Sequence, residues 1–100
     1  MVLRLPARLK NLRKITKIGN WRRFFHLHRG GEYYWKNDVT KSILHISPGY
    51  FANTIYIEYN DKPIKHFVEK GDYTKKRVRW KIQTKALQYA INWMKKHPYK

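Results

Sequence analysis

Five cations lie within the seven residues from 75 to 81, namely Lys75, Lys76, Arg77, Arg79 and Lys81. No acid separates them, so these side chains repel one another at neutral pH unless an anion binds among them. The phosphate backbone of nucleic acid is the commonest partner of such a cluster, because each phosphate contact releases counterions. The alternative is a solvated strand face whose lysines protect a sheet edge from aggregation. We favour phosphate binding, because a solvated face needs no such density of like charge.

Aromatic residues are more numerous than a core of this size needs. Four Trp, eight Tyr and four Phe make up 16% of the chain. Rings on a surface beside Lys and Arg are the side chains on which unpaired bases stack. The sequence therefore indicates a surface that combines cations for phosphates with rings for bases.

Histidine is the residue type that could carry acid–base catalysis or bind a metal. His26 and His28 are two residues apart in a predicted strand and therefore share a face. A metal site needs a third ligand, often a carboxylate, and the six acids are scattered in turns. The sequence has no glycine-rich phosphate loop and no nucleophile elbow. We therefore expect no enzyme, no metal and no other cofactor, and the enzymatic alternative is a metal-independent ribonuclease toxin that uses His26 or His45.

Short runs rich in aromatic and β-branched residues predict an antiparallel sheet. Turn signals such as Gly30-Gly31, Asn37-Asp38 and Asn60-Asp61 separate them. The expected strands cover residues 21–28, 32–36, 42–46, 53–59, 64–69 and 73–82. A helix from about Lys85 to His97 follows, with Thr84 as its cap and Pro98 after its end. Its apolar face needs one face of the sheet to pack on.

The fold class predicted for residues 20–100 is thus a single α+β domain. An antiparallel sheet of about five to six short strands carries the C-terminal helix on one face. The order of elements from about Trp21 to Lys96 is similar to that of small single-stranded-DNA-binding modules of the coactivator-like and Whirly kind. The likeness concerns the order of elements and no sequence motif, and it implies a single-stranded ligand.

Residues 1–19 form a basic N-terminal segment with six cations and no acid. Leu5, Leu9, Leu12 and Ile15 recur at helical spacing, Pro6 suits a first turn, and Gly19 suits an exit. Three structures fit this pattern, and we favour them in this order: a basic arm ordered by nucleic acid, a helix packed on the domain, and an amphipathic helix on anionic lipid. If the segment is a basic arm, Arg8, Arg13 and Lys14 contact nucleic acid.

Alternation along each strand assigns side chains to the two faces of the sheet. The aliphatic sets expected under the helix are Val78, Trp80 and Ile82, then Ile55 and Ile57, then Ile64, His66 and Val68. The outer face then carries Arg77, Arg79, Lys81, Tyr56, Lys65 and Phe67. In the first strand we bury Trp21 and Arg23, which exposes Arg22, Phe24 and His26. This outer face is the predicted nucleic-acid-binding site.

The overall charge agrees with a polyanionic partner. The chain has 23 Lys and Arg against 6 Asp and Glu, a formal charge of +17 in 100 residues. It has no cysteine and no apolar stretch near the ~18 residues of a membrane span. We expect a cytoplasmic protein that contacts no membrane and binds single-stranded DNA or RNA with little sequence specificity, and that could pair into a homodimer at a free sheet edge. The same charge also fits a ribosomal-type RNA-bound protein and a viral or mobile-element inhibitor of a host nucleic-acid machine.

Overall fold

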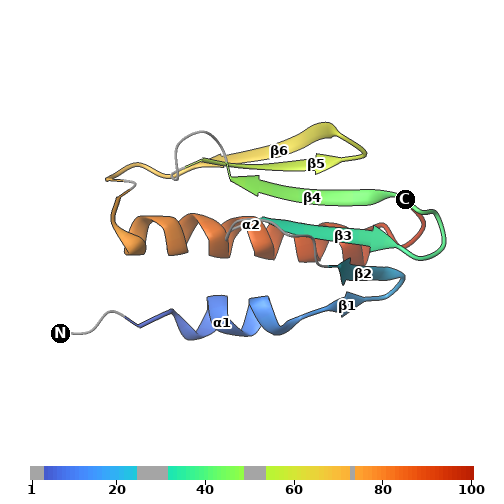
Figure 1. Ribbon diagram of the computed structural model, residues 1–100, viewed down its shortest axis with the longest axis horizontal. Helices are drawn as coiled ribbons and strands as arrows, with labels where there is room; N and C mark the ends of the chain where they lie inside the picture. The colour runs from blue at the N-terminus through green and yellow to red at the C-terminus, as the bar shows by residue number, and fades with distance from the viewer. Residues whose placement is uncertain (1–3, 25–31, 49–53, 73) are drawn as a thin grey trace.

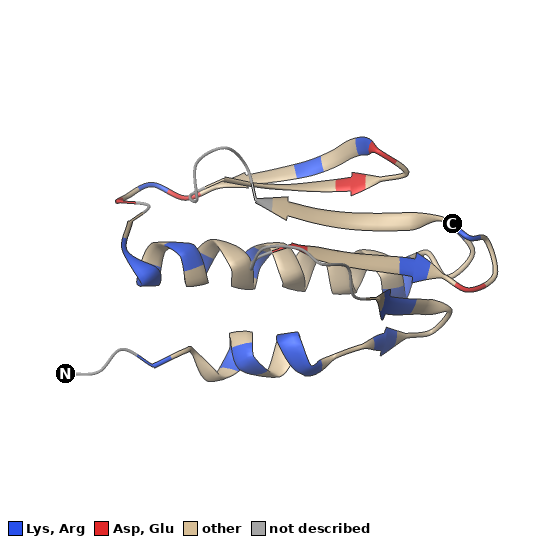
Figure 2. Ribbon diagram, in the orientation of Figure 1, with Lys and Arg blue, Asp and Glu red and all other residues tan. Residues whose placement is uncertain are grey.

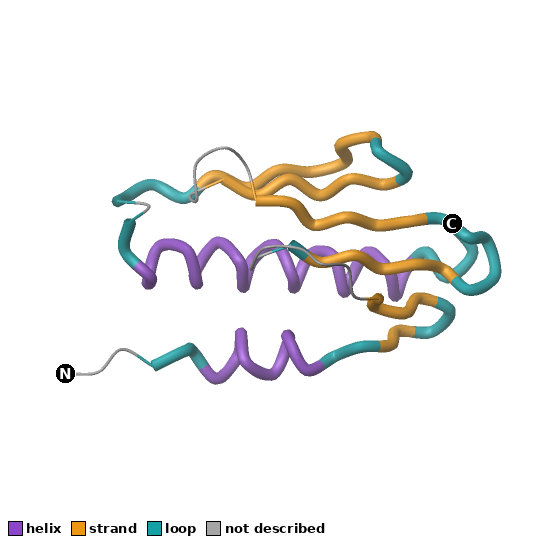
Figure 3. Tube along the Cα trace, in the orientation of Figure 1, coloured by secondary structure: helices purple, strands orange, loops and turns teal. Residues whose placement is uncertain are grey.

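The computed structural model describes residues 4–24, 32–48, 54–72 and 74–100. The described residues form two helices and six strands, and their sheet is antiparallel throughout, with strand order β1-β2-β3-β4-β5-β6 (Figures 1 and 3). The strands are β1 (Lys17–Ile18), β2 (Trp21–Phe24), β3 (Tyr33–Asn37), β4 (Ile43–Pro48), β5 (Thr54–Tyr59) and β6 (Lys62–Val68). The helices are α1 (Ala7–Lys14) and α2 (Lys76–Lys96), and α2 packs on one face of the sheet. The predicted α+β class is confirmed.

Two tight turns fix the register of the sheet. Ile18 pairs with Trp21 across the Gly19-Asn20 turn, and Gly19 takes a φ of 55° that favours glycine. Tyr59 pairs with Lys62 across Asn60-Asp61, whose φ values are 48° and 67°. Positive φ at both central residues defines the hairpin turn for which Asn and Asp are suited. These local choices account for the pairing of β1 with β2 and of β5 with β6.

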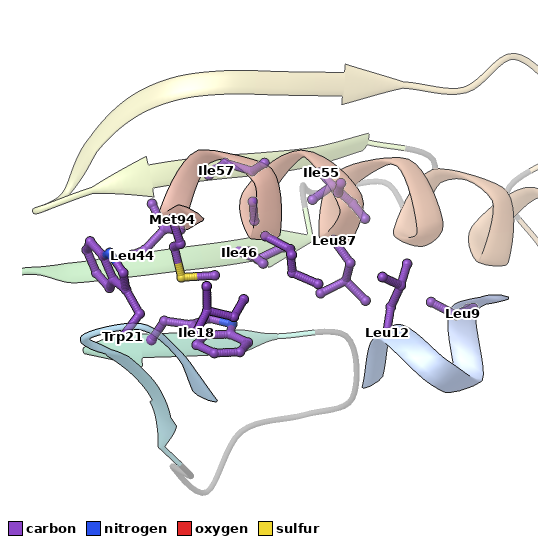
Figure 4. Close-up of a cluster of buried hydrophobic side chains, with 14 of the residues drawn as sticks. Leu9, Leu12, Ile18, Trp21, Leu44, Ile46, Ile55, Ile57, Leu87 and Met94 are labelled. Atoms are coloured by element: carbon purple, nitrogen blue, oxygen red, sulfur yellow. The ribbon is translucent and has the colours of Figure 1, made fainter. Parts of the chain in front are cut away.

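The core lies between the sheet and α2 (Figure 4). The inward positions of β4 and β5 supply Leu44, Ile46, Ile55 and Ile57, as alternation requires. The helix face that meets them carries Ile82, Leu87, Ile91 and Met94. Trp21 is fully buried, and its indole Nε1 donates to the carbonyl of His97 at 2.9 Å, which fixes the end of α2 against β2. The predicted burial of Trp21, Ile55 and Ile57 is confirmed.

The predicted strand over residues 73–82 is wrong, because α2 begins at Lys76. Val78 and Ile82 are four residues apart, and the apolar stripe continues through Ala86, Ala90 and Met94 at helical spacing. Two-residue alternation over such a short segment is also compatible with the helical spacing of three to four residues. Thr84 is not a cap, since it lies inside the helix and its hydroxyl donates to the carbonyl of Trp80 at 2.7 Å.

The predicted faces of β6 are also reversed. Phe67 and Lys65 pair with the inward residues Ile55 and Ile57, so they lie on the side of the sheet that α2 covers. Ile64 and Val68 are instead exposed. A bulge between Ile57 and Glu58 shifts the register after the hairpin, which moves every later side chain of β6 to the other face.

The first strand has the predicted register where the structure describes it. Trp21 is buried, Arg22 is exposed, and Arg23 points inward and donates to the carbonyl of Arg13 at 2.6 Å. Phe24 pairs with Tyr34 on the face away from α2. His26 and His28 lie outside the described residues.

The N-terminal segment contains a helix packed on the domain, the second of the three structures that fit its sequence. Leu9 and Leu12 of α1 belong to the core, with exposed fractions of 0% and 8%. Figure 1 shows α1 alongside α2. Gly19 is not a helix exit, because α1 ends at Lys14 and Gly19 turns β1 into β2. Neither of the described helices is long and apolar enough to cross a membrane.

Candidate nucleic-acid interface

The fold divides the predicted site residues between two surfaces. Arg22, Phe24 and Tyr56 lie on the outer face, meaning the side of the sheet away from α2. The cations of residues 4–17 and 75–96 lie on or beside α1 and α2, and we call these two segments the helical layer. The predicted residues in that layer are Arg8, Arg13, Lys14, Lys75, Lys76, Arg77, Arg79 and Lys81. Cations and rings that were expected on one face are therefore separated.

The helical layer carries the excess charge of the protein. Residues 4–17 include six Lys and Arg and residues 75–96 include eight, and neither segment has an acid. All six acids fall between Glu32 and Asp72, where there are five lysines. Figure 2 shows cations along both helices, whereas the acids lie in the sheet and its connections. Charge of one sign is thus concentrated in one layer of the fold.

Hydrogen bonds join the two segments of the layer although they are distant in sequence. Arg8 Nη2 donates to Gln88 Oε1 at 3.0 Å, and Arg13 Nη2 donates to Gln83 Oε1. Leu9 and Leu12 of α1 belong to the same hydrophobic core as the buried residues of α2. The cations of the two segments therefore lie on adjoining helices.

One face of α2 points away from the core along its whole length. Positions separated by three or four residues share this face, opposite Ile82, Ala86 and Ala90. We call these residues the outward stripe: Arg77, Lys81, Lys85, Gln88, Asn92 and Lys95. Arg79 is half-buried and lies on the other side of the helix from Arg77. The expectation that Arg77 and Arg79 share a face is therefore wrong.

Glu69, which follows β6, contacts two lysines of the outward stripe. Its two carboxylate oxygens lie 3.1 Å from Lys81 Nζ and 2.9 Å from Lys85 Nζ. Hydrogen bonds from Lys85 and then from Lys81 hold the pKa of Glu69 below its ordinary value. A carboxylate that bridges lysines one turn apart demonstrates that this pair can hold an oxyanion.

A hollow of about 390 Å³ opens on α2 next to this pair. Its lining is Arg8 from α1, Phe67 from β6, and Thr84, Lys85, Gln88, Tyr89 and Asn92 from α2. Phe67 and Tyr89 meet edge to face with ring centroids 5.7 Å apart, and Lys65 Nζ lies 5.6 Å and 5.7 Å from the two centroids. The two predicted site residues of β6, Lys65 and Phe67, therefore join the helical layer at its edge.

Five residues of this hollow were not among the predicted site residues: Thr84, Lys85, Gln88, Tyr89 and Asn92. The sequence predicts Thr84 as a helix cap and the helix that follows only as an element that packs on the sheet. The spacing of four residues between Lys81 and Lys85 was the sequence signal that could have placed Lys85 on the same helix face as the other cations. Phe67 was predicted, although for the wrong face.

The outer face carries a row of rings that cover one another. Tyr34 stacks on His45 with centroids 4.0 Å apart and an interplanar angle of 11°, and Phe24 lies 5.7 Å from Tyr34. Burial first, and then the charges of Glu32, Glu58 and Asp61, raise the pKa of Tyr34. Ring faces that are occupied by neighbouring rings are not offered to a base. Tyr56, 40% exposed and tilted on His66, is the more accessible predicted ring here.

Charge on the outer face is mixed. Arg22 pairs with Asp38 at 3.3 Å, and His45 Nδ1 lies 3.9 Å from Glu58. The Nε2 atom of His45 is buried, so this ring presents little to a substrate. Within the part of the chain that the structure describes, no three His, Asp or Glu side chains are grouped so that they could hold a metal ion.

The fold and this surface define a small α+β protein with an acid-free, cation-rich helical layer. Comparison with protein-family models, curated proteins and solved structures finds no match to the chain.

Proposed function

We propose that this protein is a non-enzymatic nucleic-acid-binding protein that holds the phosphate backbone on its helical layer. The observation that carries the proposal is the concentration of six and eight cations in two segments that lack acids and pack side by side. Repulsion within such a layer opposes folding, and a bound polyanion removes that cost. Phosphates spaced along a strand can neutralise many of these cations at once.

A membrane surface is the other common polyanion, and the packing of α1 argues against it. Insertion of an amphipathic helix into lipid requires its apolar residues to face the bilayer. Leu9 and Leu12 are buried in the protein core instead. The helical layer therefore offers lipid a charged surface without an apolar face to insert.

The proposal includes single-stranded DNA or RNA as the ligand and little sequence specificity. Contacts from Lys and Arg to phosphates position a protein on nucleic acid without reading bases. Lys and Arg are the only charged residues of the two segments, while Tyr89 and Phe67 add rings at one edge. A cytoplasmic location remains part of the proposal, as does a homodimer through the edge strand β6.

Binding to single- and double-stranded DNA and RNA of equal length, measured at several salt concentrations, tests this function. We expect log affinity to fall linearly with log salt, with about 0.7 per phosphate contact on a single strand. Several contacts at once should give a steep slope. Affinity that does not change with salt would contradict phosphate binding by the helical layer.

A further inference from the structure

The hollow on α2 contains the chemical groups that a single nucleotide requires. Arg8 and Lys85 supply positive charge, Gln88 and Asn92 supply amides, and the Phe67–Tyr89 pair supplies rings. Pockets for small ligands have volumes of roughly 300–1,000 Å³, and this one measures about 390 Å³. The lining comes from α1, α2 and β6, so the fold and not one local motif assembles it.

The amides in the hollow are oriented by a chain of hydrogen bonds. Arg8 donates to Gln88 Oε1 at 3.0 Å, and Gln88 Nε2 donates to Asn92 Oδ1 at 3.1 Å. The Asn92 side chain is exposed, and with its oxygen engaged its Nδ2 group is left to act as a donor. Among the residues that the structure describes, none accepts a hydrogen bond from that group. Amide donors of this kind bind acceptor atoms on base edges.

The cationic side of the hollow already holds an oxyanion. Lys85 Nζ lies 2.9 Å from Glu69 Oε2, and half of the Lys85 side chain is exposed. A phosphate oxygen can replace the carboxylate oxygen there, and Arg8 supplies a second cation to the lining of the same hollow. The Phe67–Tyr89 ring pair belongs to the same lining, and Lys65 Nζ adds a further cation 5.6 Å and 5.7 Å from the two ring centroids.

We propose that the hollow binds one unpaired nucleotide, with its phosphate between Arg8 and Lys85, its base edge at Asn92 and its base ring against Phe67 and Tyr89. This inference rests on the proposed function and deepens it by naming the unpaired nucleotide as the recognised unit. Bases in a duplex are stacked and paired, so they cannot enter the hollow. Single strands therefore bind more tightly than duplexes of the same length.

Two matched pairs of variants test the site in the full chain. Lys85→Ala and Lys81→Ala each remove one charge and one contact to Glu69, but only Lys85 lines the hollow. Asn92→Ala and Asn11→Ala each remove one exposed amide from the helical layer, but only Asn92 lines it. Affinity for a fluorescent single-stranded oligonucleotide and for its duplex is measured for all four, with circular dichroism to verify folding.

We expect Lys85→Ala and Asn92→Ala to weaken single-strand binding by about tenfold relative to their controls, the effect of losing a hydrogen bond to a charged or buried polar partner. Duplex binding should be equal within each pair. Equal losses within each pair on single strands would overturn the nucleotide site while leaving the proposed function intact. A wild-type protein that binds neither form would instead overturn the proposed function.

Titration with a nucleoside monophosphate and with inorganic phosphate separates the base from the phosphate. We expect the nucleotide to shift the side-chain amide NMR signals of Gln88 and Asn92, and phosphate at equal concentration to shift them much less. Equal shifts would show an anion site that does not recognise a base, which would contradict the proposal.

Discussion

At the scale of single residues, Glu69 opposes the function proposed for the helical layer. Its carboxylate occupies Lys81 and Lys85, which would otherwise be free to contact phosphate. The gain in stability from this contact is small, about 0–1 kcal/mol, because both lysines are more than half exposed. We therefore expect a change at Glu69 to affect the proposed binding more than folding.

Glu69→Gln should therefore tighten nucleic-acid binding by several-fold and steepen its salt dependence. Removal of the carboxylate releases two lysines and eliminates a negative charge near the phosphates. Asp72→Asn is the matched control, because it removes the same charge three residues away, where the carboxylate accepts hydrogen bonds from Thr74. Equal gains for the two variants would mean that only net charge matters.

The lowered pKa of Glu69 also predicts how its contribution to stability varies with pH. A carboxyl group with a lower pKa in the folded state stabilises the protein above its unfolded pKa of about 4.3, and this contribution disappears as pH falls through the folded value. The difference in melting temperature between the wild type and Glu69→Gln should be present at pH 7 and vanish in acid. A melting-temperature difference that grows as the pH falls would contradict this prediction.

At the scale of elements, α1 was the segment that sequence could not assign. The spacing of Leu5, Leu9 and Leu12 is visible in the sequence, but it does not exclude an arm, a packed helix or a lipid-bound helix. The residues that select the packed helix are Gln83 and Gln88, which are 70 and 80 residues away from their partners Arg13 and Arg8. Sequence patterns carry no information about such distant contacts.

Leu9→Ala should destabilise the protein by about 2–5 kcal/mol, because it opens a cavity at a fully buried position. Lys10→Ala, at the next and exposed position, should change stability by less than about 0.5 kcal/mol. Urea unfolding of both variants tests the packing of α1. If Leu9→Ala unfolds at the same midpoint as the wild type, α1 contributes nothing to the core.

The start of α2 was mispredicted for a different reason. Val78, Trp80 and Ile82 alternate as in a strand, while Val78, Ile82 and Ala86 repeat as in a helix. The two patterns differ only in how far the helical spacing continues. Because the predicted helix was started after Thr84, its apolar stripe was not extended back to Val78 and Ile82. The β3, β4 and β5 strands were predicted well, since each is bounded by strong turn residues.

Substitutions at Arg77 and Arg79 can distinguish, in solution, a strand from a helix in this segment. In a strand both would point to one face, whereas in α2 they point to opposite sides. We expect Arg77→Ala to weaken nucleic-acid binding and Arg79→Ala to affect binding less and stability more, because Arg79 is half-buried. Binding and thermal unfolding are measured together, and equal losses of affinity at unchanged stability would favour a strand.

At the scale of the whole molecule, the fold brings two cationic segments from opposite ends of the sequence into one layer. Net charge can be calculated from composition, but the location of that charge on the protein depends on which segments pack together. The helical layer gathers two segments without acids, and the outer face mixes Arg22 and Lys36 with Asp38 and Glu58. The sequence predicted a cationic surface, and it assigned that surface to the wrong side of the sheet.

The most direct test of the helical layer compares two charge reversals of equal size. Lys10→Glu with Arg77→Glu alters one exposed cation in each segment of the layer, and Arg22→Glu with Lys36→Glu alters two cross-strand neighbours on the outer face. Both double variants lower the net charge equally, so a long-range effect on affinity is the same. We predict that, on a single-stranded oligonucleotide, the first variant loses far more affinity and has a shallower log–log salt slope than the second. The same loss for both variants, or a larger loss for the outer face, would contradict binding by the helical layer.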